Sequence, residues 1–266
     1  MNCLVVIPAR YASARLPGKP LADIAGKPMV VRVHERAVAS GVGPVVVATD
    51  DERVVAVARA GGADAVLTSA AHASGTDRIA EVAAMRGLGP DTVVVNVQGD
   101  EPLLPPSLIE QVASNLSDRP DFAIASLCEA IEREEEIFDP GVVKVVFGAD
   151  GRAAYFSRAP IPYRRGRFEP DVGISRADSP RACAAVAGLH HRHIGLYAYR
   201  AKFLARFASL APAPSELAES LEQLRAIHHG FPIHVEVARE RPGPGVDTPA
   251  DLERVRAIFE ATASDG

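Results

Sequence analysis

The sequence predicts an α/β protein with a mostly parallel central sheet flanked by helices. Short runs rich in β-branched residues alternate with longer segments of helical period, and several of the short runs are apolar throughout, as strands covered on both faces must be. The strands predicted in the first half are Cys3 to Pro8, Val45 to Thr49, Asp64 to Thr68 and Val93 to Gln98. The helices predicted there are Pro28 to Ser40, Asp51 to Ala60, Thr76 to Arg86 and Ser107 to Leu116.

The second half is less regular. VVKVVF and RAAYFS, separated by the turn residues Ala149, Asp150 and Gly151, predict a hairpin, and Pro160 to Ala187 reads as an irregular arm. Further strands are predicted at His193 to Arg200 and Pro232 to Ala238, and helices at Lys202 to Ala208, Ser215 to His228 and Thr248 to Ala261. With no internal repeat and no low-complexity linker, residues 1–266 are expected to form one domain, with the hairpin and arm at about 140–192.

Composition limits the classes of function. Lys and Arg number 29 against 34 Asp and Glu, a formal charge of −5, and aromatic residues make up 5% with no Trp. This composition argues against a general nucleic-acid-binding protein, which needs a basic face and stacking rings. Three isolated cysteines, no basic lead before the first apolar run and no run of about 18 apolar residues predict a cytoplasmic protein with reduced thiols and no membrane span.

The loop after the first predicted strand carries Arg10, Arg15 and Lys19 before its first acid, Asp23. Ligands of open parallel sheets bind beyond the carboxyl ends of the strands, and clustered cations there suit a polyphosphate. A solvated charged loop is the alternative. No GxxxxGK[ST] or GxGxxG motif follows a predicted strand, which argues against a P-loop protein and against a nicotinamide-dependent dehydrogenase.

Two aspartates are candidate metal ligands. Asp100 follows the strand that ends near Gln98, at the same sheet edge as the basic loop, and Asp247 precedes the last predicted helix. Carboxylates at such positions hold hard cations such as Mg²⁺, which in turn bridge to phosphates. Each aspartate could instead be an ordinary turn or helix-capping residue.

Several segments together resemble the 3-deoxy-manno-octulosonate (Kdo) cytidylyltransferases, the CMP-Kdo synthetases. They are VVIPARYASARLPGKPLADIAGKPM, HASGTDRIAEV, VNVQGDEPLLP, VVKVVF, YFSRAPIP, RHIGLYAYR, LEQLRAI and PGPGVDTPADLERVR. The resemblance runs from Val5 to about Arg256. It implies a Rossmann-like, nucleotide-diphospho-sugar transferase-like fold, CTP and Kdo as substrates, Mg²⁺ as cofactor, no nucleic-acid or membrane partner, a role in lipopolysaccharide biosynthesis, and a homodimer.

The resemblance also implies roles for individual residues. Arg10, Arg15 and Lys19 become triphosphate ligands, Asp100 and Asp247 become Mg²⁺ ligands, and Asp100, Asp247, Lys19 and Arg10 become the catalytic group. Ala9, Ser74 and Gly75 are expected around the cytidine. The implied sugar contacts are Arg78, Gln98, Arg158, His193, Tyr197, Glu222 and Gln223.

Other interpretations stay open for some of these residues. His191 and His193 share a strand face, which is compatible with zinc or with an ordinary polar strand end. On the predicted helix from Ser215, a stripe of Leu217, Leu221, Leu224 and His228 is expected to face the core, leaving Glu219 and Gln223 on the opposite side with Glu222 at the flank. Without the resemblance, Glu222 and Gln223 would be solvated.

The acceptor and the arm also leave alternatives. The acceptor could be a related acid sugar, 8-amino-Kdo or sialate, and a catalytically silent nucleotide-binding homologue is the alternative from another class. The stretch after Tyr163 is longer and more basic than the family pattern, so the path of the arm, a candidate dimer contact, is not predicted.

Overall fold

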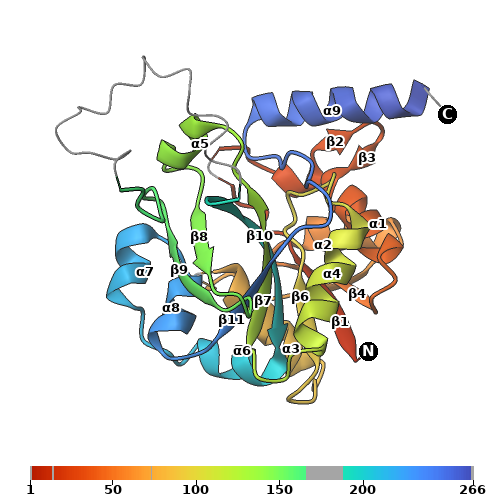
Figure 1. The fold of residues 1–266 in the computed structure, drawn as a ribbon. Coiled ribbons are helices and arrows are strands. Elements are labelled where there is room, and N and C mark those ends of the chain that lie inside the picture. Colours follow the sequence, from red (N-terminus) through yellow and green to blue (C-terminus); the bar gives the residue numbers. More distant parts are fainter. Residues whose placement is uncertain (1, 14, 73, 166–187, 265–266) are drawn as a thin grey trace. The chain divides into compact units, whose positions relative to one another are not determined.

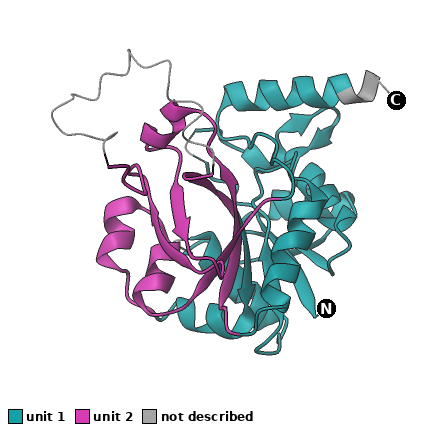
Figure 2. Cartoon of the chain, viewed as in Figure 1, with its two compact units in different colours: residues 1–120, 196–209, 239–266 teal, residues 121–195, 210–238 magenta. Residues whose placement is uncertain are grey.

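The structure, a computed structural model, describes residues 2–13, 15–72, 74–165 and 188–264 (Figure 1). The chain divides into two compact units, coloured separately in Figure 2. Unit 1 comprises residues 1–120, 196–209 and 239–266, and unit 2 comprises residues 121–195 and 210–238.

Unit 1 contains the predicted parallel sheet. Four strands, β1 (Cys3–Pro8), β4 (Val45–Thr49), β5 (Asp64–Leu67) and β6 (Val93–Asn96), pair in parallel in the order β6-β1-β4-β5. The second half of β10 (His191–Arg200) pairs antiparallel with β6, Tyr197 lying opposite Asn96. Every residue of β4 and β6 is buried, which is why these runs read as continuously apolar.

Helices pack against this sheet in two groups. Helix α1 (Met29–Ala39) contacts both α2 (Glu52–Ala60) and α4 (Pro106–Ser117). Helix α3 (Gly75–Met85) contacts α6 (Ala201–Phe207). The last helix, α9 (Pro249–Ser264), contacts β2 (Asp23–Ile24), which forms a small hairpin with β3 (Lys27–Pro28). The fold class predicted from the sequence, a mostly parallel sheet flanked by helices, is confirmed.

Two helix starts in unit 1 are capped by side chains. Asp51 caps α2 by accepting a hydrogen bond from the N–H of Arg53 at 2.9 Å. At the start of α9, the Asp251 N–H donates to Thr248 Oγ1 at 3.2 Å and the Asp251 carboxylate accepts from the Thr248 N–H at 2.9 Å. A cap of this kind stabilises a helix by about 1 kcal/mol.

Unit 2 holds the remaining elements. Strand β7 (Ile124–Ala130) pairs in parallel with β11 (Ile233–Val237), and β8 (Lys144–Phe147) pairs antiparallel with β9 (Ala153–Ser157), which is the predicted hairpin. Strand β8 also pairs with the first residues of β10, His191 lying opposite Val145. The helices of unit 2 are α5 (Glu134–Phe138), α7 (Pro214–Glu219) and α8 (Gln223–His228). The arm expected after Tyr163 lies largely outside the described residues.

Three details of unit 2 differ from the prediction. Strand β7 and helix α5 have no counterpart among the predicted elements. The single helix predicted from Ser215 to His228 is wrong, because the chain breaks into α7 and α8 at Ser220, whose φ of 53° is left-handed. With the break the expected core stripe fails at both ends: Leu217 is 69% exposed and His228 is exposed, whereas Leu221 and Leu224 are buried.

The remaining expectations concern thiols and membranes. Cys3 and Cys128 are buried free thiols, and burial raises the pKa of each to about 12. Cys183 lies outside the described residues. Within the described part of the chain, none of the helices has the length and apolar character that crossing a bilayer requires.

Candidate active site

The basic loop after β1 is ordered by its backbone. Ala9, buried just past β1, donates its N–H to the carbonyl of Ala48 at 2.8 Å. Further along, Lys19–Leu21 form a 3-10 turn that begins after Gly18, whose φ of 70° lies in the left-handed region that favours glycine. The loop therefore carries its charged side chains on a defined backbone.

Lys19, Asp100 and Asp247 form a charge cluster in unit 1. The Lys19 Nζ lies 2.7 Å from Asp100 Oδ2 and 3.3 Å from Asp247 Oδ1, and it donates to the carbonyl of Val246 at 3.1 Å. Arg15 contributes a second cation, its Nη2 lying 3.0 Å from the same Asp247 oxygen. Two cations of the basic loop therefore lie together with both candidate metal ligands.

Two close backbone contacts hold the Asp100 and Asp247 carboxylates near Lys19. The Val246 N–H donates to the carbonyl of Asp100 at 2.8 Å, which joins the loop before α9 to the loop after β6. Gly99 lies against the end of β1: a Cβ there would be 2.6 Å from the carbonyl oxygen of Pro8, nearer than real Cβ atoms come. Any larger residue at 99 would move the loop that carries Asp100.

Glu101 is a neighbouring acid to which the sequence assigned no role. Burial raises its pKa to about 7, and the charges of Asp100 and Asp247 add to the rise while Lys19 opposes it. Burial and the two neighbouring carboxylates together therefore favour the neutral form of Glu101. The sequence signal was its position beside Asp100 in the GDEP segment.

The donor set suits a hard cation of the Mg²⁺ type. Among the described residues no group of three or more His, Cys, Asp and Glu side chains is arranged to hold a metal ion, so a closed protein cage is not available there. Mg²⁺ does not need one, because it is usually held by one or two carboxylates together with substrate phosphates and water. Asp100 and Asp247 already share one cation, the Lys19 ammonium, which shows that the pair accommodates positive charge.

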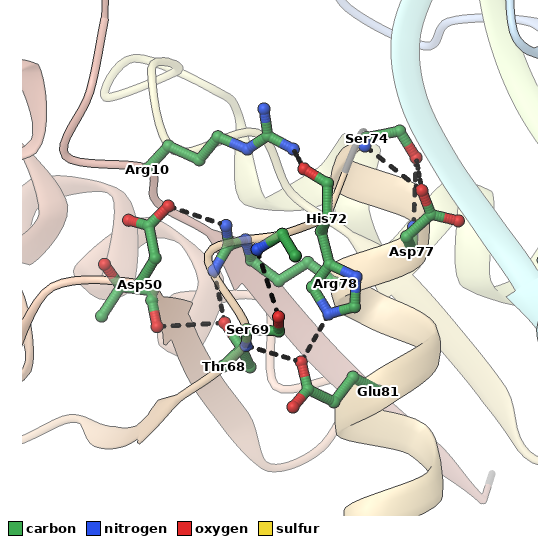
Figure 3. A network of polar contacts seen from close by, with 11 residues as sticks. Arg10, Asp50, Thr68, Ser69, His72, Ser74, Asp77, Arg78 and Glu81 are labelled. Carbon is green, nitrogen blue, oxygen red and sulfur yellow. Dashed lines mark hydrogen bonds and ion pairs between the residues drawn. The ribbon is translucent and has the colours of Figure 1, made fainter.

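Arg10 belongs to a second polar network in unit 1, drawn in Figure 3. Its guanidinium donates to the carbonyl of His72, whose ring Nε2 pairs with the Glu81 carboxylate at 2.5 Å. Glu81 also accepts the N–H of Ser69 at 3.0 Å. Helix α3 thus holds the loop after β5, and that loop holds Arg10 through one guanidinium nitrogen.

Arg78 lies beneath this network as a fully buried cation. Its Nη2 is 3.0 Å from Asp50 Oδ2 and its Nη1 donates to Thr68 Oγ1, while its Nε is buried with no hydrogen-bond partner among the described residues. Burial lowers the pKa of Arg78, Asp50 opposes the shift and the nearby positive charge of Arg10 adds to it. The structure places this predicted sugar contact inside the protein, bonded to its own chain, and its role toward a sugar stays a prediction.

The predicted cytidine contacts lie at the start of α3. Ser74 caps the helix in a reciprocal box with Asp77: its Oγ accepts the Asp77 N–H at 3.1 Å, and the carboxylate accepts the Ser74 N–H at 3.2 Å. A Cβ on Gly75 would meet Pro8 at 3.9 Å, so the helix start lies close to the end of β1. Ala9, Ser74 and Gly75 are therefore gathered at one edge of unit 1.

Two predicted sugar contacts belong to unit 1. Gln98 lies in the segment that joins β6 to Asp100 and is half-buried. Its backbone carbonyl accepts the N–H of Glu101 at 3.2 Å. Tyr197 is half-buried on β10, and its ring stacks on Tyr199 with centroids 5.6 Å apart.

Two others are held firmly within unit 2. The Arg158 N–H donates to the Glu219 carboxylate at 2.8 Å, and its guanidinium donates to the carbonyls of Glu219 at 2.7 Å and of Pro140 at 2.8 Å. The His193 Nε2 lies 2.8 Å from Ser126 Oγ, and its ring packs edge-on against Phe156. Burial lowers the pKa of His193 to about 3.

The last two predicted contacts are Glu222 and Gln223. Glu222 is exposed at the start of α8 and Gln223 is buried, so the expectation that Gln223 lies on the side away from the core is wrong. Glu219, expected beside it, accepts from Ser157 Oγ at 2.6 Å as well as from Arg158. The turn at Ser220 separates residue 219 from residue 223, so the two do not lie on one helical face.

Comparison with known proteins defines the class. A family model described as cytidylyltransferase matches residues 4–235. The chain belongs to the cytidylyltransferase family.

Particular relatives narrow the assignment. A 3-deoxy-manno-octulosonate cytidylyltransferase of Marinobacter nauticus is 54% identical over 266 residues, the whole of both chains. The structure of CMP:2-keto-3-deoxy-manno-octonic acid synthetase complexed with CTP has a TM-score of 0.85 and 42% identity, covering 98% of this chain and all of that one. A cytidylyltransferase from Leptospira borgpetersenii, at 16% identity and TM-score 0.61 over 98% of this chain and 87% of that one, shares the fold.

Proposed function

We propose that this protein transfers CMP from CTP to Kdo, giving CMP-Kdo and pyrophosphate for lipopolysaccharide biosynthesis. The observation that carries the proposal is the cluster in which Lys19 and Arg15 meet Asp100 and Asp247 in unit 1. Cations for a triphosphate and carboxylates for its metal are the two components that nucleotidyl transfer requires. The full-length relative at 54% identity is named for this activity.

The reaction is an in-line displacement at the α-phosphorus. The 2-hydroxyl oxygen of Kdo forms a bond to that phosphorus, the bond to the bridging oxygen of the pyrophosphate breaks, and the hydroxyl proton passes to water. Positioning and charge neutralisation supply most of the catalysis in such transfers. Arg10, Arg15 and Lys19 bind the triphosphate and offset the charge that develops on the leaving pyrophosphate.

Asp100 and Asp247 are the residues that would hold Mg²⁺. When bound, the ion supplies charge stabilisation at the phosphate and lowers the pKa of the attacking hydroxyl. The protein's own contribution is to orient both carboxylates, which it does through the backbone bond from Val246 to Asp100 and through the close approach of Gly99 to β1. Ser74 and Gly75, at the start of α3, are proposed beside the cytidine with Ala9.

The remaining parts of the proposal concern the sugar and the setting. Arg78, Gln98, Arg158, His193, Tyr197, Glu222 and Gln223 are the sugar contacts that the resemblance implied, and they stay predictions. We also propose a homodimer in the cytoplasm, acting on small molecules without a nucleic-acid or membrane partner. Light scattering on the purified protein tests the dimer, since a monomer mass would contradict it.

One assay tests the activity and its nearest alternatives. Pyrophosphate release is measured with CTP, UTP, ATP and GTP, each crossed with Kdo, 8-amino-Kdo and sialate. Turnover confined to CTP with Kdo supports the proposal. Turnover with a different sugar would keep the chemistry and change the acceptor, and no turnover with any pair would favour a silent nucleotide-binding homologue.

Asp100→Asn gives a sharper test of the metal role. The substitution keeps the size of the side chain and removes its charge, so we expect kcat to fall by about 10²- to 10³-fold, as when other electrostatic groups of a transition state are removed. Asp64→Asn is the control, because Asp64 is 51% exposed and pairs with Arg86 on the surface. A rate within threefold of wild type for Asp100→Asn at saturating Mg²⁺ would remove Asp100 from the metal site.

A further inference from the structure

The Lys19 ammonium is saturated by the two carboxylates and the backbone beside them. An ammonium has three N–H donors, and Lys19 has three acceptors within reach: Asp100 at 2.7 Å, Asp247 at 3.3 Å and the Val246 carbonyl at 3.1 Å. Its side chain is 15% exposed. Lys19 cannot bind a phosphate with these donors until at least one of the three contacts is broken.

The backbone around Lys19 restricts how those contacts can break. The Lys19 N–H donates to the carbonyl of Leu16 at 3.1 Å, its own carbonyl accepts from Ala22 at 3.1 Å, and Pro20 beside it is buried. An exchange of partners is therefore a rotation of the four-carbon side chain about a fixed backbone. Lysine suits this movement, because its charge is a compact ammonium on a flexible stem.

We propose that Lys19 is an internal counter-ion that takes the place of the metal between Asp100 and Asp247 and couples nucleotide binding to metal binding. Without nucleotide, a divalent cation must displace the ammonium from both carboxylates. When the triphosphate arrives, it attracts Lys19 away and leaves the carboxylates free for the metal. This inference rests on the proposed function, because it uses the assignment of the same residues to phosphate and metal.

The coupling predicts that one substitution at Lys19 changes the affinities for metal and for nucleotide in opposite directions. By linkage, a nucleotide that releases the ammonium raises the affinity for the metal, and the metal raises the affinity for the nucleotide by the same factor. Replacing Lys19 by a neutral residue removes both the competitor and a like charge at the metal position. The substitution should therefore strengthen metal binding in the absence of nucleotide while it weakens nucleotide binding.

Arg15 takes a lesser part in the same arrangement. It contacts the Asp247 oxygen that Lys19 contacts, at 3.0 Å, but its side chain is 66% exposed. Solvent screens such a pair, so its removal should change metal affinity in the same direction by a smaller factor.

The test is Mn²⁺ binding to the full-length protein without nucleotide, measured by the electron paramagnetic resonance signal of free Mn²⁺. For Lys19→Met we expect the dissociation constant to fall about tenfold, within the range of about 5- to 150-fold found for coupled sites. The matched control is Lys202→Met, since Lys202 is an exposed lysine paired with Asp91 at 2.8 Å. It should leave Mn²⁺ binding unchanged.

A second titration, of CTP in EDTA by calorimetry, completes the signature. Lys19→Met should weaken CTP binding even though it strengthens Mn²⁺ binding. Arg15→Gln provides the same comparison with a smaller expected change in Mn²⁺ affinity. Because Arg15 is exposed, this variant should fold and can replace Lys19→Met if that variant does not fold.

Failure of the inference and failure of the proposed function give different results. If Asp100→Asn abolishes Mn²⁺ binding but Lys19→Met and Arg15→Gln leave it unchanged or weaker, the metal assignment stands and the counter-ion role is overturned. If Mn²⁺ binding is insensitive to Asp100→Asn, the metal assignment itself fails and the inference fails with it.

Discussion

His193 should make the stability of this protein depend on pH in a calculable way. The ring lies beside Phe156 and its Nε2 lies 2.8 Å from Ser126 Oγ, which itself donates to the Ile194 carbonyl at 3.1 Å. Because the one hydroxyl hydrogen of Ser126 is used in that bond, the imidazole Nε2 is the donor to Ser126. Burial lowers the folded-state pKa from 6.5 to about 3, so the folded ring stays neutral at pH 5.

The sign and size of the effect follow from proton linkage. Between pH 6.5 and about 3 the unfolded chain binds a proton at His193 that the folded chain does not, so the stability contributed by the neutral ring is complete above pH 6.5 and falls as the pH drops. From pH 7.5 to pH 5.0 the loss is about 2 kcal/mol, set by the 1.5-unit gap between the unfolded pKa of 6.5 and pH 5.0.

The assay is urea unfolding, followed by far-ultraviolet circular dichroism at the two pH values, for wild type and His193→Gln. Glutamine can still donate to Ser126 but does not titrate. Wild type should lose about 2 kcal/mol more than the variant between pH 7.5 and 5.0, and every other titrating group is common to both proteins. Parallel losses in the two proteins would refute the placement of a neutral imidazole at this position.

Two further predictions concern unit 1. Arg78→Met leaves Asp50 without its buried partner and should lower the free energy of unfolding by about 3 kcal/mol. The control Arg86→Met breaks an exposed pair and should lower it by less than about 1 kcal/mol. Equal losses of the two variants in urea titrations would contradict the buried pair. Gly99→Ala places a Cβ 2.6 Å from the Pro8 carbonyl oxygen. We therefore expect the free energy of unfolding to fall by about 1–3 kcal/mol and kcat with CTP to fall by a larger proportion. Unchanged steady-state kinetics would show that the contact is dispensable.

Much of unit 1 could be predicted from the sequence because the information is local. Strands buried on both faces leave continuous apolar runs, and the carboxyl ends of parallel strands share one edge of a sheet. That rule was enough to expect the basic loop after β1 and Asp100 after β6 in the same place. In the structure the Lys19 Nζ lies 2.7 Å from Asp100 Oδ2, in agreement with this rule.

Other features depend on contacts that no local pattern encodes. Nothing in the segment around Arg78 indicates that a helical arginine would be fully buried against Asp50, 28 residues earlier. The break at Ser220 interrupts a stretch with continuous helical period, and what opposes that period is the set of bonds that Glu219 makes to Ser157 and Arg158. Tertiary contacts of this kind override local propensity.

Strand β7 was missed for a different reason. Its sequence, IASLCEA, contains small residues and a glutamate in place of a β-branched run, so propensity alone does not indicate a strand. It is buried along six of its seven residues and is paired with β11, which follows it by about a hundred positions in the chain. Pairing with strands distant in the sequence, β11 among them, makes the segment a strand.

The backbone bond from Val246 to Asp100 also bears on the order in which the protein is made. The cations of the basic loop and Asp100 lie early in the sequence, whereas Asp247 follows Asp100 by 147 positions. Any product of termination between Asp100 and Asp247 contains the whole basic loop and still lacks one of the two carboxylates that contact Lys19. The cluster around Lys19 can therefore form only after residue 247 has been added.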